Sequence, residues 1–422
     1  MNDTIKYYVG EFVRNLTYSI YTFGTKSRLG KCIESLFAKV MSLNGLSYYP
    51  IVSVQKYMED TNNVTIKTIV DNRVGFEGNV VYDDEEYKPE LKPQKLLNIR
   101  LQIYNDVCVT GNSDMIVDTK RACIINDACY NIAPEVLFID GLLYRDKKNV
   151  GVLRSNMRHF DETIECGIMI NGKFSQNYYH TITENLIRLL VVNELDISNE
   201  VPLLVDEKVR LVPSMSRILN ILNIKSKPVI YLQPTKTYCV KQLYYVDHIN
   251  KLVPHIKGIN TQKSGIVAFD RSYMTNLRDI LLDHISNKKT PKRIFLTRKN
   301  TNHRNYNENE VFSVLAPFGF EQVAPEEYSF EEQMALFHNA EWIVGGSGAA
   351  FTNLIFCSKG CNVVIFRSIR NKNTSPLFST LAYFNEVKII YYLPTQSGSS
   401  TSIHSDYEID TTLFGEYIKA HI

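Results

Sequence analysis

Short apolar runs alternate with amphipathic segments in the part of the chain that follows residue 291. The helical periodicity between the runs predicts helices that end near residues 315 and 340, and a further helix after the third run. Strands and helices that alternate in this way form a parallel sheet with helices on both faces. The runs predict strands at 293–297, 321–324, 342–344, 362–366 and 387–393.

Two sequence signals mark where helices of this region begin. Asn307 followed by Glu310, and Ser329 followed by Glu332, have the spacing of a capping box. In that motif the first side chain accepts a hydrogen bond from a backbone amide of the first turn, and the acidic side chain accepts one from the backbone amide of the first residue. We therefore expect helices to begin at these two positions.

The middle of the chain shows a similar alternation. Its apolar runs and periodic segments predict strands at 164–170, 202–205, 229–231 and 237–246, and helices after residue 178, at 214–222 and at about 270–286. A chain of 422 residues exceeds the size of one ordinary core. We therefore assign residues 1–265 to a first domain and residues 266–422 to a second.

The front of the chain follows other patterns. Residues 1–45 form a helical extension in this interpretation, because aromatic and basic side chains are interleaved there with helical periodicity. Such a segment could dock on an anionic membrane surface, although packing on its own domain or on a second subunit is the more ordinary arrangement. Residues 49–160 are β-rich, with strand-like runs at 51–54, 64–70, 79–82, 101–104, 115–117 and 122–125.

Composition places the chain among globular proteins that have no general affinity for nucleic acid. Hydrophobic residues make up 44%, and 47 Lys and Arg against 45 Asp and Glu leave a formal charge of +2, so any basic site must be local. The eight cysteines show neither a CxxC pair nor zinc-ligand spacing, which predicts reduced thiols in a cytoplasmic protein. No apolar run approaches the roughly 20 residues that span a bilayer, and the charged amino terminus does not resemble a signal peptide.

The stretch WIVGGSGAAFTN, residues 342–353, joins a strand-like run to a glycine-rich turn and the start of a helix. Gly345, Gly346 and Gly348 allow a sharp turn and the close approach of a ligand. The first amides of the helix have no partner within it and suit a phosphate. The alternative is that the glycines only let the helix and the strand pack closely, and this stretch alone does not separate the two interpretations.

A second stretch places three polar side chains at helical spacing. His180, Glu184 and Arg188 lie four residues apart, so one helix would present them on one face. The opposite face should be the core face and carries Ile182, Leu186, Leu189 and Leu190. The start of a helix after a strand is a common ligand site in α/β enzymes. An exposed helix with a Glu184–Arg188 ion pair is the alternative.

Basic side chains gather in KRIFLTRKNTNHR, residues 292–304, around one strand and the loop after it. In a parallel sheet this loop lies at the same edge as the glycine turn. Arg298 and Arg304 could hold a diphosphate there through paired hydrogen bonds. A nucleic-acid patch is the weaker interpretation, because the chain lacks a second basic stripe.

These stretches resemble glycosyltransferase family 61. IFLTRK, RNYNENEV and GFEQVAPEEYSFEEQMALFHNAEWIVGGSGAAFTNLIF are similar to the carboxyl-terminal block of that family, and NYYHTITENLIRLL is similar to its amino-terminal motif. The similarity covers roughly 165–366, with the motifs in the family's order. Two positions differ, because Ser347 stands where the family usually has histidine and Ile187 where it has proline.

The resemblance implies an inverting glycosyltransferase of the GT-B type, an α/β protein with two Rossmann-like domains that face a cleft. The first domain would take the acceptor, and the second would bind a nucleoside-diphosphate sugar as a substrate, with no cofactor. Tyr179, His180, Glu184 and Arg188 match the front motif, and Tyr179 and Arg188 are expected to contact substrate. The positions that match the donor-side motifs are Arg298, Arg304, Asn307, Glu308, Gln333, Gly346, Ser347, Gly348, Ala349 and Asn353.

An inverting transfer needs a base that takes the proton of the acceptor hydroxyl, and positive charge on the departing diphosphate. We expect Glu184 to be the base, with His180 orienting it or the acceptor, and the reverse assignment stays open. Arg298 and Arg304 would stabilise the leaving group. No Asp-x-Asp follows an apolar strand, and the acidic run at 406–410 looks like surface, so we expect catalysis without a divalent metal.

The leading hypothesis is a cytoplasmic enzyme that builds a cell-surface or capsular polysaccharide, with a nucleotide sugar and a glycan acceptor as its partners and no nucleic acid. A hypothesis from another class is a non-catalytic subunit that binds a nucleotide or a glycan through the glycine turn and the arginines. The amino-terminal helices could add a homo-oligomeric or peripheral membrane contact. Which sugar, which acceptor hydroxyl and what residues 1–150 recognise do not follow from these motifs.

Overall fold

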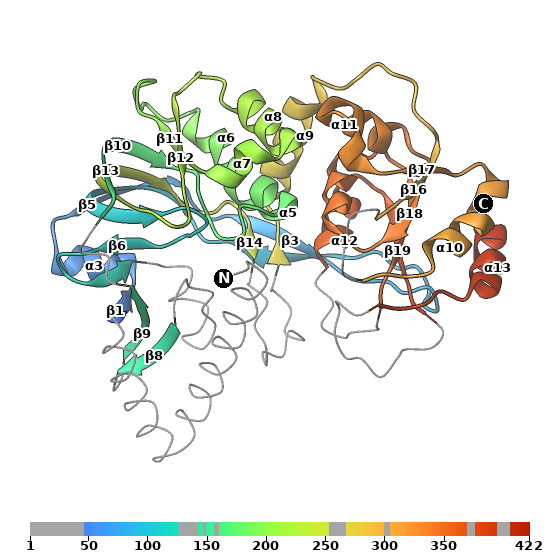
Figure 1. Ribbon diagram of the computed structural model, residues 1–422, viewed down its shortest axis with the longest axis horizontal. Helices are drawn as coiled ribbons and strands as arrows, with labels where there is room; N and C mark the ends of the chain where they lie inside the picture. The colour runs from blue at the N-terminus through green and yellow to red at the C-terminus, as the bar shows by residue number, and fades with distance from the viewer. Residues whose placement is uncertain are drawn as a thin grey trace, which may run out of the picture.

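The computed structural model describes residues 46–125, 142–146, 149–155, 160–252, 267–298, 304–368, 376–394 and 406–422. These residues form two α/β halves, each built on its own large sheet (Figure 1). The mixed α/β class predicted from the sequence is therefore confirmed. The helical extension expected at 1–45 lies outside the described residues.

The first half is built on a sheet of eleven strands among the described residues. Four neighbouring strands at one end of it run parallel, in the order β12-β11-β10-β13. These strands are β10 (Glu162–Met169), β11 (Leu203–Asp206), β12 (Val229–Leu232) and β13 (Thr237–Val246). They agree closely with the strands that the apolar runs in the middle of the chain predict.

The β-rich front of the chain extends this sheet in a largely antiparallel manner, beginning with β5 (Ile99–Thr110), which pairs with β13. The strand predicted at 64–70 is found with those bounds, whereas the run at 79–82 makes only an isolated bridge, between Tyr82 and Tyr391. The other strands of the sheet are β1 (Leu46–Val52), β2 (Val64–Val70), β6 (Ile116–Asp118), β7 (Cys123–Ile125), β8 (Leu142–Asp146) and β9 (Asn149–Ser155). A separate short pair joins β14 (Lys251–Leu252) to β15 (Val267–Ala268).

Most helices of the first half lie between its parallel strands and the second half, whereas the short helix at 54–60 lies at the far side, beside the antiparallel strands (Figure 1). Their apolar faces are buried because Ile, Leu and Val recur at helical spacing, as in α8. The helices predicted at 214–222 and about 270–286 are found as α8 and α9. The helices of this half are α3 (Val54–Asp60), α5 (Tyr178–His180), α6 (Leu189–Val192), α7 (Glu207–Leu211), α8 (Pro213–Leu222) and α9 (Arg271–Leu282).

The second half contains a five-stranded sheet in the order β17-β16-β18-β19-β20, and every described pairing in it is parallel. This confirms the parallel sheet that the alternating pattern predicts. The strands are β16 (Arg293–Leu296), β17 (Glu321–Val323), β18 (Trp342–Gly346), β19 (Asn362–Phe366) and β20 (Lys388–Tyr392). The main helices are α10 (Glu308–Leu315), α11 (Phe330–Asn339), η5 (Ala349–Phe356), α12 (Leu377–Phe384) and α13 (Thr411–His421).

One of the two predicted capping boxes is present. Ser329 and Glu332 exchange both hydrogen bonds at the start of α11. The capping box predicted at Asn307 is wrong, although Asn307 does precede α10. Its side chain instead makes two 2.9 Å hydrogen bonds with the backbone of Ile409, because the carboxyl-terminal segment lies beside it.

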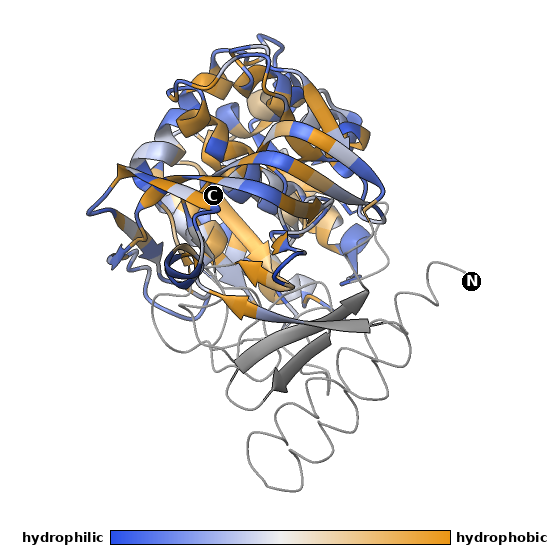
Figure 2. Ribbon diagram, turned by 90° about the vertical axis from the view of Figure 1, so that its left-hand side faces the viewer, coloured by the Kyte–Doolittle hydropathy of each residue, from blue (hydrophilic) through white to orange (hydrophobic). Residues whose placement is uncertain are grey.

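One hydrophobic core cluster contains buried side chains from both halves. It includes Leu186 and Leu219 from the first half and Ile294, Phe351 and Leu381 from the second. Figure 2 shows hydrophobic and hydrophilic stretches next to each other along the strands and helices, as expected of elements that bury one face. Burial of apolar surface therefore holds the two sheets in one body.

A β-hairpin from the front of the chain also reaches the second half. Its strands are β3 (Val74–Gly78) and β4 (Leu91–Lys95), and the amide of Gly78 donates to Oγ1 of Thr380 at 2.8 Å. The segment after β3 then lies along β20, where the amide of Tyr391 donates to the carbonyl of Val81 at 2.9 Å. Residues ahead of the boundary predicted at 265 therefore lie against the second sheet, while α9, which follows that boundary, packs on both α8 and η5.

Thr380 supplies a hydrogen bond at this junction that can be tested directly. It is fully buried, so Thr380→Val should leave the Gly78 amide without its partner and lower the free energy of unfolding by roughly 1–3 kcal/mol. Thr352 is equally buried, but its hydroxyl has no partner among the described residues, so Thr352→Val should be neutral or stabilising. Urea unfolding measures both changes, and an equal loss in the two variants would contradict the role of Thr380.

Candidate functional site

The glycine turn has the strand-turn-helix form that the sequence predicts. Strand β18 ends at Gly346, and the chain re-enters a helix at Ala349, although η5 is a 3₁₀-helix. A Cβ atom at Gly345 would lie 2.9 Å from Cβ of Leu296 on the neighbouring strand, so this glycine serves close packing. A Cβ atom at Gly348 would meet only the Gly346 carbonyl, at 3.8 Å, so the turn is open on that side.

Two arginines from the basic loop converge on this turn. Nη1 of Arg298 donates to the carbonyl of Ser347 at 3.0 Å, and Nη1 of Arg304 donates to the same oxygen at 2.8 Å. The expectation that the basic loop and the glycine turn share one sheet edge is therefore confirmed. The amide of Ser347 donates to the carbonyl of Phe366 within the sheet, so it is not directed at a ligand.

A third guanidinium belongs to the same positive region. Arg367 directly follows β19 and lies over the ring of Tyr391, 5.2 Å from its centroid. Burial lowers the pKa of Arg304, and the positive charges of Arg298 and Arg367 lower it further. The sequence interpretation did not include Arg367, although a residue directly after a parallel strand is expected at the sheet edge where the glycine turn lies.

Asn307 and Glu308 hold the loop that carries the arginines. The Glu308 carboxylate accepts from the backbone amide of Arg298, with oxygens at 3.2 and 3.4 Å. The amide group of Asn307 fixes Ile409, as described above. In this structure both predicted donor-side residues contact protein backbone.

A chain of hydrogen bonds links the glycine-turn helix to the front motif. The hydroxyl of Tyr178 donates to Oδ1 of Asn353 at 2.6 Å, and Nδ2 of Asn353 donates to Oε1 of Gln333 at 3.4 Å. Gln333 in turn donates to the Tyr328 carbonyl at 3.2 Å. The structure thus brings Gln333 and Asn353 together and connects them with a residue two positions from His180.

His180 and Glu184 form a pair, with His180 Nδ1 bonded to Glu184 Oε1. The side chains are 28% and 16% exposed, so the imidazole is the more accessible of the two. Burial disfavours charge on His180, but the carboxylates of Glu184 and Asp114 outweigh burial and raise the pKa of the imidazole above its ordinary value. The ring of Phe174 lies against it, with ring centroids 5.0 Å apart.

Arg188 is buried, not exposed beside this pair, and its positive charge acts on both Glu184 and Asp114. Its side chain is fully buried, and Nη2 donates to the carbonyl of Asn171 at 2.8 Å. The cause is local, because residues 181–185 form a π-helical turn and residues 186–188 a 3₁₀ turn, which change the rotation per residue. Arg188 therefore ties this segment to the end of β10, and its contact with substrate stays a prediction.

Tyr179 is also turned inward. It is 4% exposed and packs edge-on against the rings of Phe269 and Phe378. Its contact with substrate stays a prediction, and it is the neighbouring Tyr178 that reaches Asn353. Nothing in the sequence motif marked Tyr178 as the residue that would contact Asn353.

A second acid–base pair lies near the first and was missed from the sequence. Nε2 of His248, just after β13, lies 3.7 Å from Oδ1 of Asp114, which follows β5. Burial opposes charge on Asp114, but His248 and Arg188 lower the pKa of its carboxyl below the ordinary value. Neither residue has a neighbour in sequence that indicates a site, and only the sheet brings them together.

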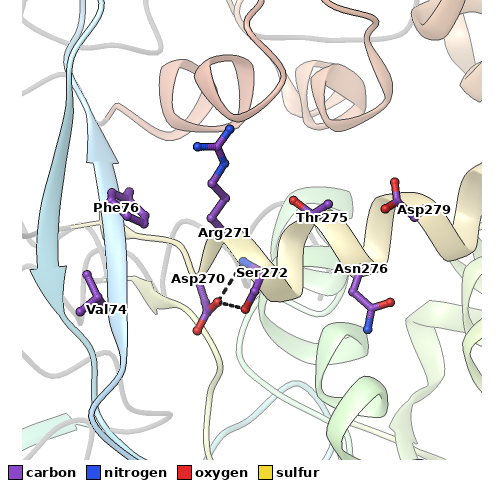
Figure 3. Close-up of a pocket in the computed structure, with 8 residues that line it drawn as sticks. All are labelled: Val74, Phe76, Asp270, Arg271, Ser272, Thr275, Asn276 and Asp279. Atoms are coloured by element: carbon purple, nitrogen blue, oxygen red, sulfur yellow. Dashed lines mark hydrogen bonds between the residues drawn. The ribbon is translucent and has the colours of Figure 1, made fainter.

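A pocket of about 650 Å³ lies elsewhere, between β3 and the start of α9 (Figure 3). Val74 and Phe76 line one side of it, and Arg271, Thr275 and Asp279 project from the helix. None of the residues assigned to chemistry above lines this pocket. We therefore treat it as separate from the candidate site.

Three further properties concern the described residues as a whole. No three His, Cys, Asp or Glu side chains among them gather in a way that could hold a metal ion. Within the same part of the chain, every helix is too short or too polar to cross a membrane. The six cysteines that are described are free.

Comparison with known proteins agrees with the positions of these motifs. A family model described as Glycosyltransferase 61 matches residues 178–364. The match begins at Tyr178 and extends through the basic loop, α11 and the glycine turn. No curated protein matches the chain.

The charge coupling of His180 and Glu184 predicts a change in titration. Replacing Glu184 by Gln should lower the pKa of His180, because the imidazolium loses its nearest carboxylate. Since the folded-state pKa is raised, the pair stabilises the protein below the ordinary histidine pKa of about 6.5, and this contribution disappears as the pH rises through the raised value. NMR titration of the imidazole resonances, assigned with His180→Gln, measures the shift. An unchanged or higher His180 pKa in Glu184→Gln would contradict the coupling.

Proposed function

We propose that this chain, whose residues 178–364 belong to glycosyltransferase family 61, transfers a sugar from a nucleoside-diphosphate sugar to a glycan or polysaccharide acceptor with inversion at the anomeric carbon. The family implies glycosyltransferase activity on glycans. The observation that supports the donor class is the convergence of Arg298 and Arg304 on the carbonyl of Ser347. A diphosphate is the ligand whose charge suits two guanidiniums at an open glycine turn.

In this proposal the arginines act on the leaving group. As the acceptor oxygen attacks the anomeric carbon, the bond to the diphosphate breaks and negative charge develops on the departing phosphate. Arg298 and Arg304 stabilise that charge, and Arg367 adds to the positive potential that lowers the pKa of Arg304. Because the guanidiniums supply this charge, we propose that transfer does not depend on a divalent metal.

We propose His180 as the base and Glu184 as the residue that orients it, which is the reverse of the first expectation from the sequence. With Nδ1 of His180 donating to Glu184, the lone pair on Nε2 accepts the proton of the acceptor hydroxyl. The imidazole is also the more exposed partner, and its raised pKa makes it a stronger base. The imidazolium formed during transfer stays paired with the carboxylate, as in other His–carboxylate dyads.

The arrangement of the two halves supports a GT-B assignment. Each half contains neighbouring parallel strands, and the proposed base follows β10 while the proposed diphosphate site follows β16 and β18. The hydrogen bond between Tyr178 and Asn353 connects the segments that carry the two sites. The first half is then the acceptor side and the second the donor side. The cytoplasmic location and the membrane contact stay predictions.

Donor binding gives the first test. A panel of nucleoside diphosphates and nucleotide sugars should raise the melting temperature of the wild-type protein, by mass action on the folded state. Arg298→Ala and Arg304→Ala should each weaken binding by at least about tenfold, since each removes a charge-assisted contact. Arg293→Ala is the control, because Arg293 lies at the other end of β16 and bonds to the Phe318 carbonyl.

Binding without turnover would favour the alternative, a non-catalytic subunit that binds a nucleotide or a glycan. Release of nucleoside diphosphate from the bound donor, with water or a glycan as acceptor, separates the two. The same assay with EDTA tests the independence from metal, and loss of turnover with chelator would refute it. If no member of the panel binds, the proposed donor class is wrong.

The choice of base is tested by the pH dependence of turnover. Replacing His180 by Gln should reduce kcat by roughly 10²–10⁴-fold, the range for a general base. Glu184→Gln should keep part of the activity, and its kcat/KM should rise at lower pH than in the wild type, since the imidazole loses the carboxylate that raises its pKa. If Glu184→Gln were the more damaging variant and showed no shift of the pH profile, Glu184 would be the base.

A further inference from the structure

The segment 406–410, near the carboxyl end, lies beside the loop that carries the arginines. The amide of Asn305 donates to Oδ1 of Asp406 at 2.7 Å, and the amide of Tyr407 donates to the carbonyl of Asn305 at 3.0 Å. The two hydrogen bonds between Asn307 and Ile409 continue this pairing. The acidic residues of this segment are exposed, as the sequence predicts, while Tyr407 and Ile409 turn inward and fix it against the proposed donor site. The segment lies outside the part of the chain that the family model matches.

The ring of Tyr407 is held in place by stacking. It lies parallel to the ring of Tyr306, with centroids 5.3 Å apart and an interplanar angle of 6°. Tyr306 also contacts the ring of Phe366 at the end of β19, with centroids 5.6 Å apart. The position of the Tyr407 hydroxyl is thus set by Tyr306, in the loop before α10, which itself packs on Phe366 of the second sheet.

The hydroxyl of Tyr407 points at the glycine turn. A Cβ atom at Gly346 would lie 3.2 Å from Oη of Tyr407, 3.0 Å from Cε1 of Tyr306 and 3.3 Å from Cδ of Arg298. Contacts this short are tight for a side chain, so the glycine is what lets the phenol and the arginine approach the same backbone position. Gly346 therefore marks a place where several polar groups converge.

This hydroxyl is buried and has no hydrogen-bond partner among the described residues. Burial raises the pKa of Tyr407, and the nearby charges of Arg298, Arg304 and Arg367 act in the opposite direction. The phenol is neutral at physiological pH and keeps a proton to donate. An unpaired hydroxyl in a buried position is unfavourable, so its presence beside three cations points to a ligand that accepts.

We propose that the Tyr407 hydroxyl donates a hydrogen bond to a phosphate oxygen of the donor diphosphate. This inference rests on the proposed function and extends its donor site to the carboxyl-terminal segment. The guanidiniums of Arg298 and Arg304 and the phenol are all donors, and an anionic oxygen is the acceptor that suits all three. Tyr407 is then a donor-binding residue that completes the site from a part of the chain outside the family motifs.

Tyr407→Phe tests this proposal, because it keeps the stacked ring and removes only the oxygen. Without ligand, the melting temperature should stay the same or rise, since a buried unpaired hydroxyl is removed. The Kd for the nucleoside diphosphate that the wild type binds should increase about tenfold, the loss of one hydrogen bond to a charged group. Binding of inorganic pyrophosphate should be weakened by a similar factor, because the contact is to phosphate.

Tyr417→Phe is the matched control. Tyr417 belongs to the same aromatic cluster as Tyr407, where it stacks on His421 in α13 and packs against Tyr392 and Phe414. The same substitution there should leave both Kd values unchanged.

Three outcomes would overturn the role of Tyr407. The first is an unchanged Kd for the nucleoside diphosphate in Tyr407→Phe. The second is weaker binding of the nucleoside diphosphate with unchanged binding of pyrophosphate. The third is a lower melting temperature of the unliganded variant. Failure of the proposed function is distinguishable, because the wild-type protein would then bind no nucleoside diphosphate. If Arg298→Ala loses binding while Tyr407→Phe binds as the wild type does, the donor site stands and only this inference falls.

Discussion

The close approach of groups at Gly345 and Gly346 is the constraint on which the proposed donor site depends. At Gly345 the missing side chain lets β18 lie against Leu296 of β16, and at Gly346 it makes room for Arg298 and the two stacked tyrosines. The carbonyl of Ser347 is then within reach of both arginines. The packing role of the glycines and their proposed role in ligand binding therefore both follow from one backbone path, although the sequence presents them as alternatives.

The two halves of the molecule are connected by apolar packing and by specific polar contacts. The shared hydrophobic cluster and the hairpin β3–β4 hold the sheets together, while the hydrogen bond from Tyr178 to Asn353 sets the position of the front motif relative to the glycine turn. Because an amide side chain has both an acceptor and a donor, Asn353 contacts Tyr178 and Gln333 at the same time. Gln333 and Asn353, which match the donor-side motifs in the sequence, are therefore also part of the connection between the two halves.

Sequence patterns predicted the parts of the fold that repeat and failed where local geometry departs from a regular helix. The five parallel strands of the second sheet were predictable because strands buried on both faces read as apolar runs. The burial of Arg188 was not predicted, because its position relative to His180 depends on a π-helical turn and spacing alone implies a regular helix. Asp114, His248, Arg367 and Tyr407 were not found, since strand pairing or chain contacts bring them to their sites from distant positions.

The charges near the glycine turn explain why a residue such as Tyr407 belongs with the arginines. Arg298, Arg304 and Arg367 repel one another, and partial burial of Arg304 increases that cost, as the lowered pKa of Arg304 shows. Such a group of like charges is stabilised when an anion occupies the space between them. A neutral hydroxyl adds a donor to that space without adding to the repulsion. A tyrosine therefore suits this position better than a fourth cation, and its stacking on Tyr306 fixes the hydroxyl without using any of the arginines.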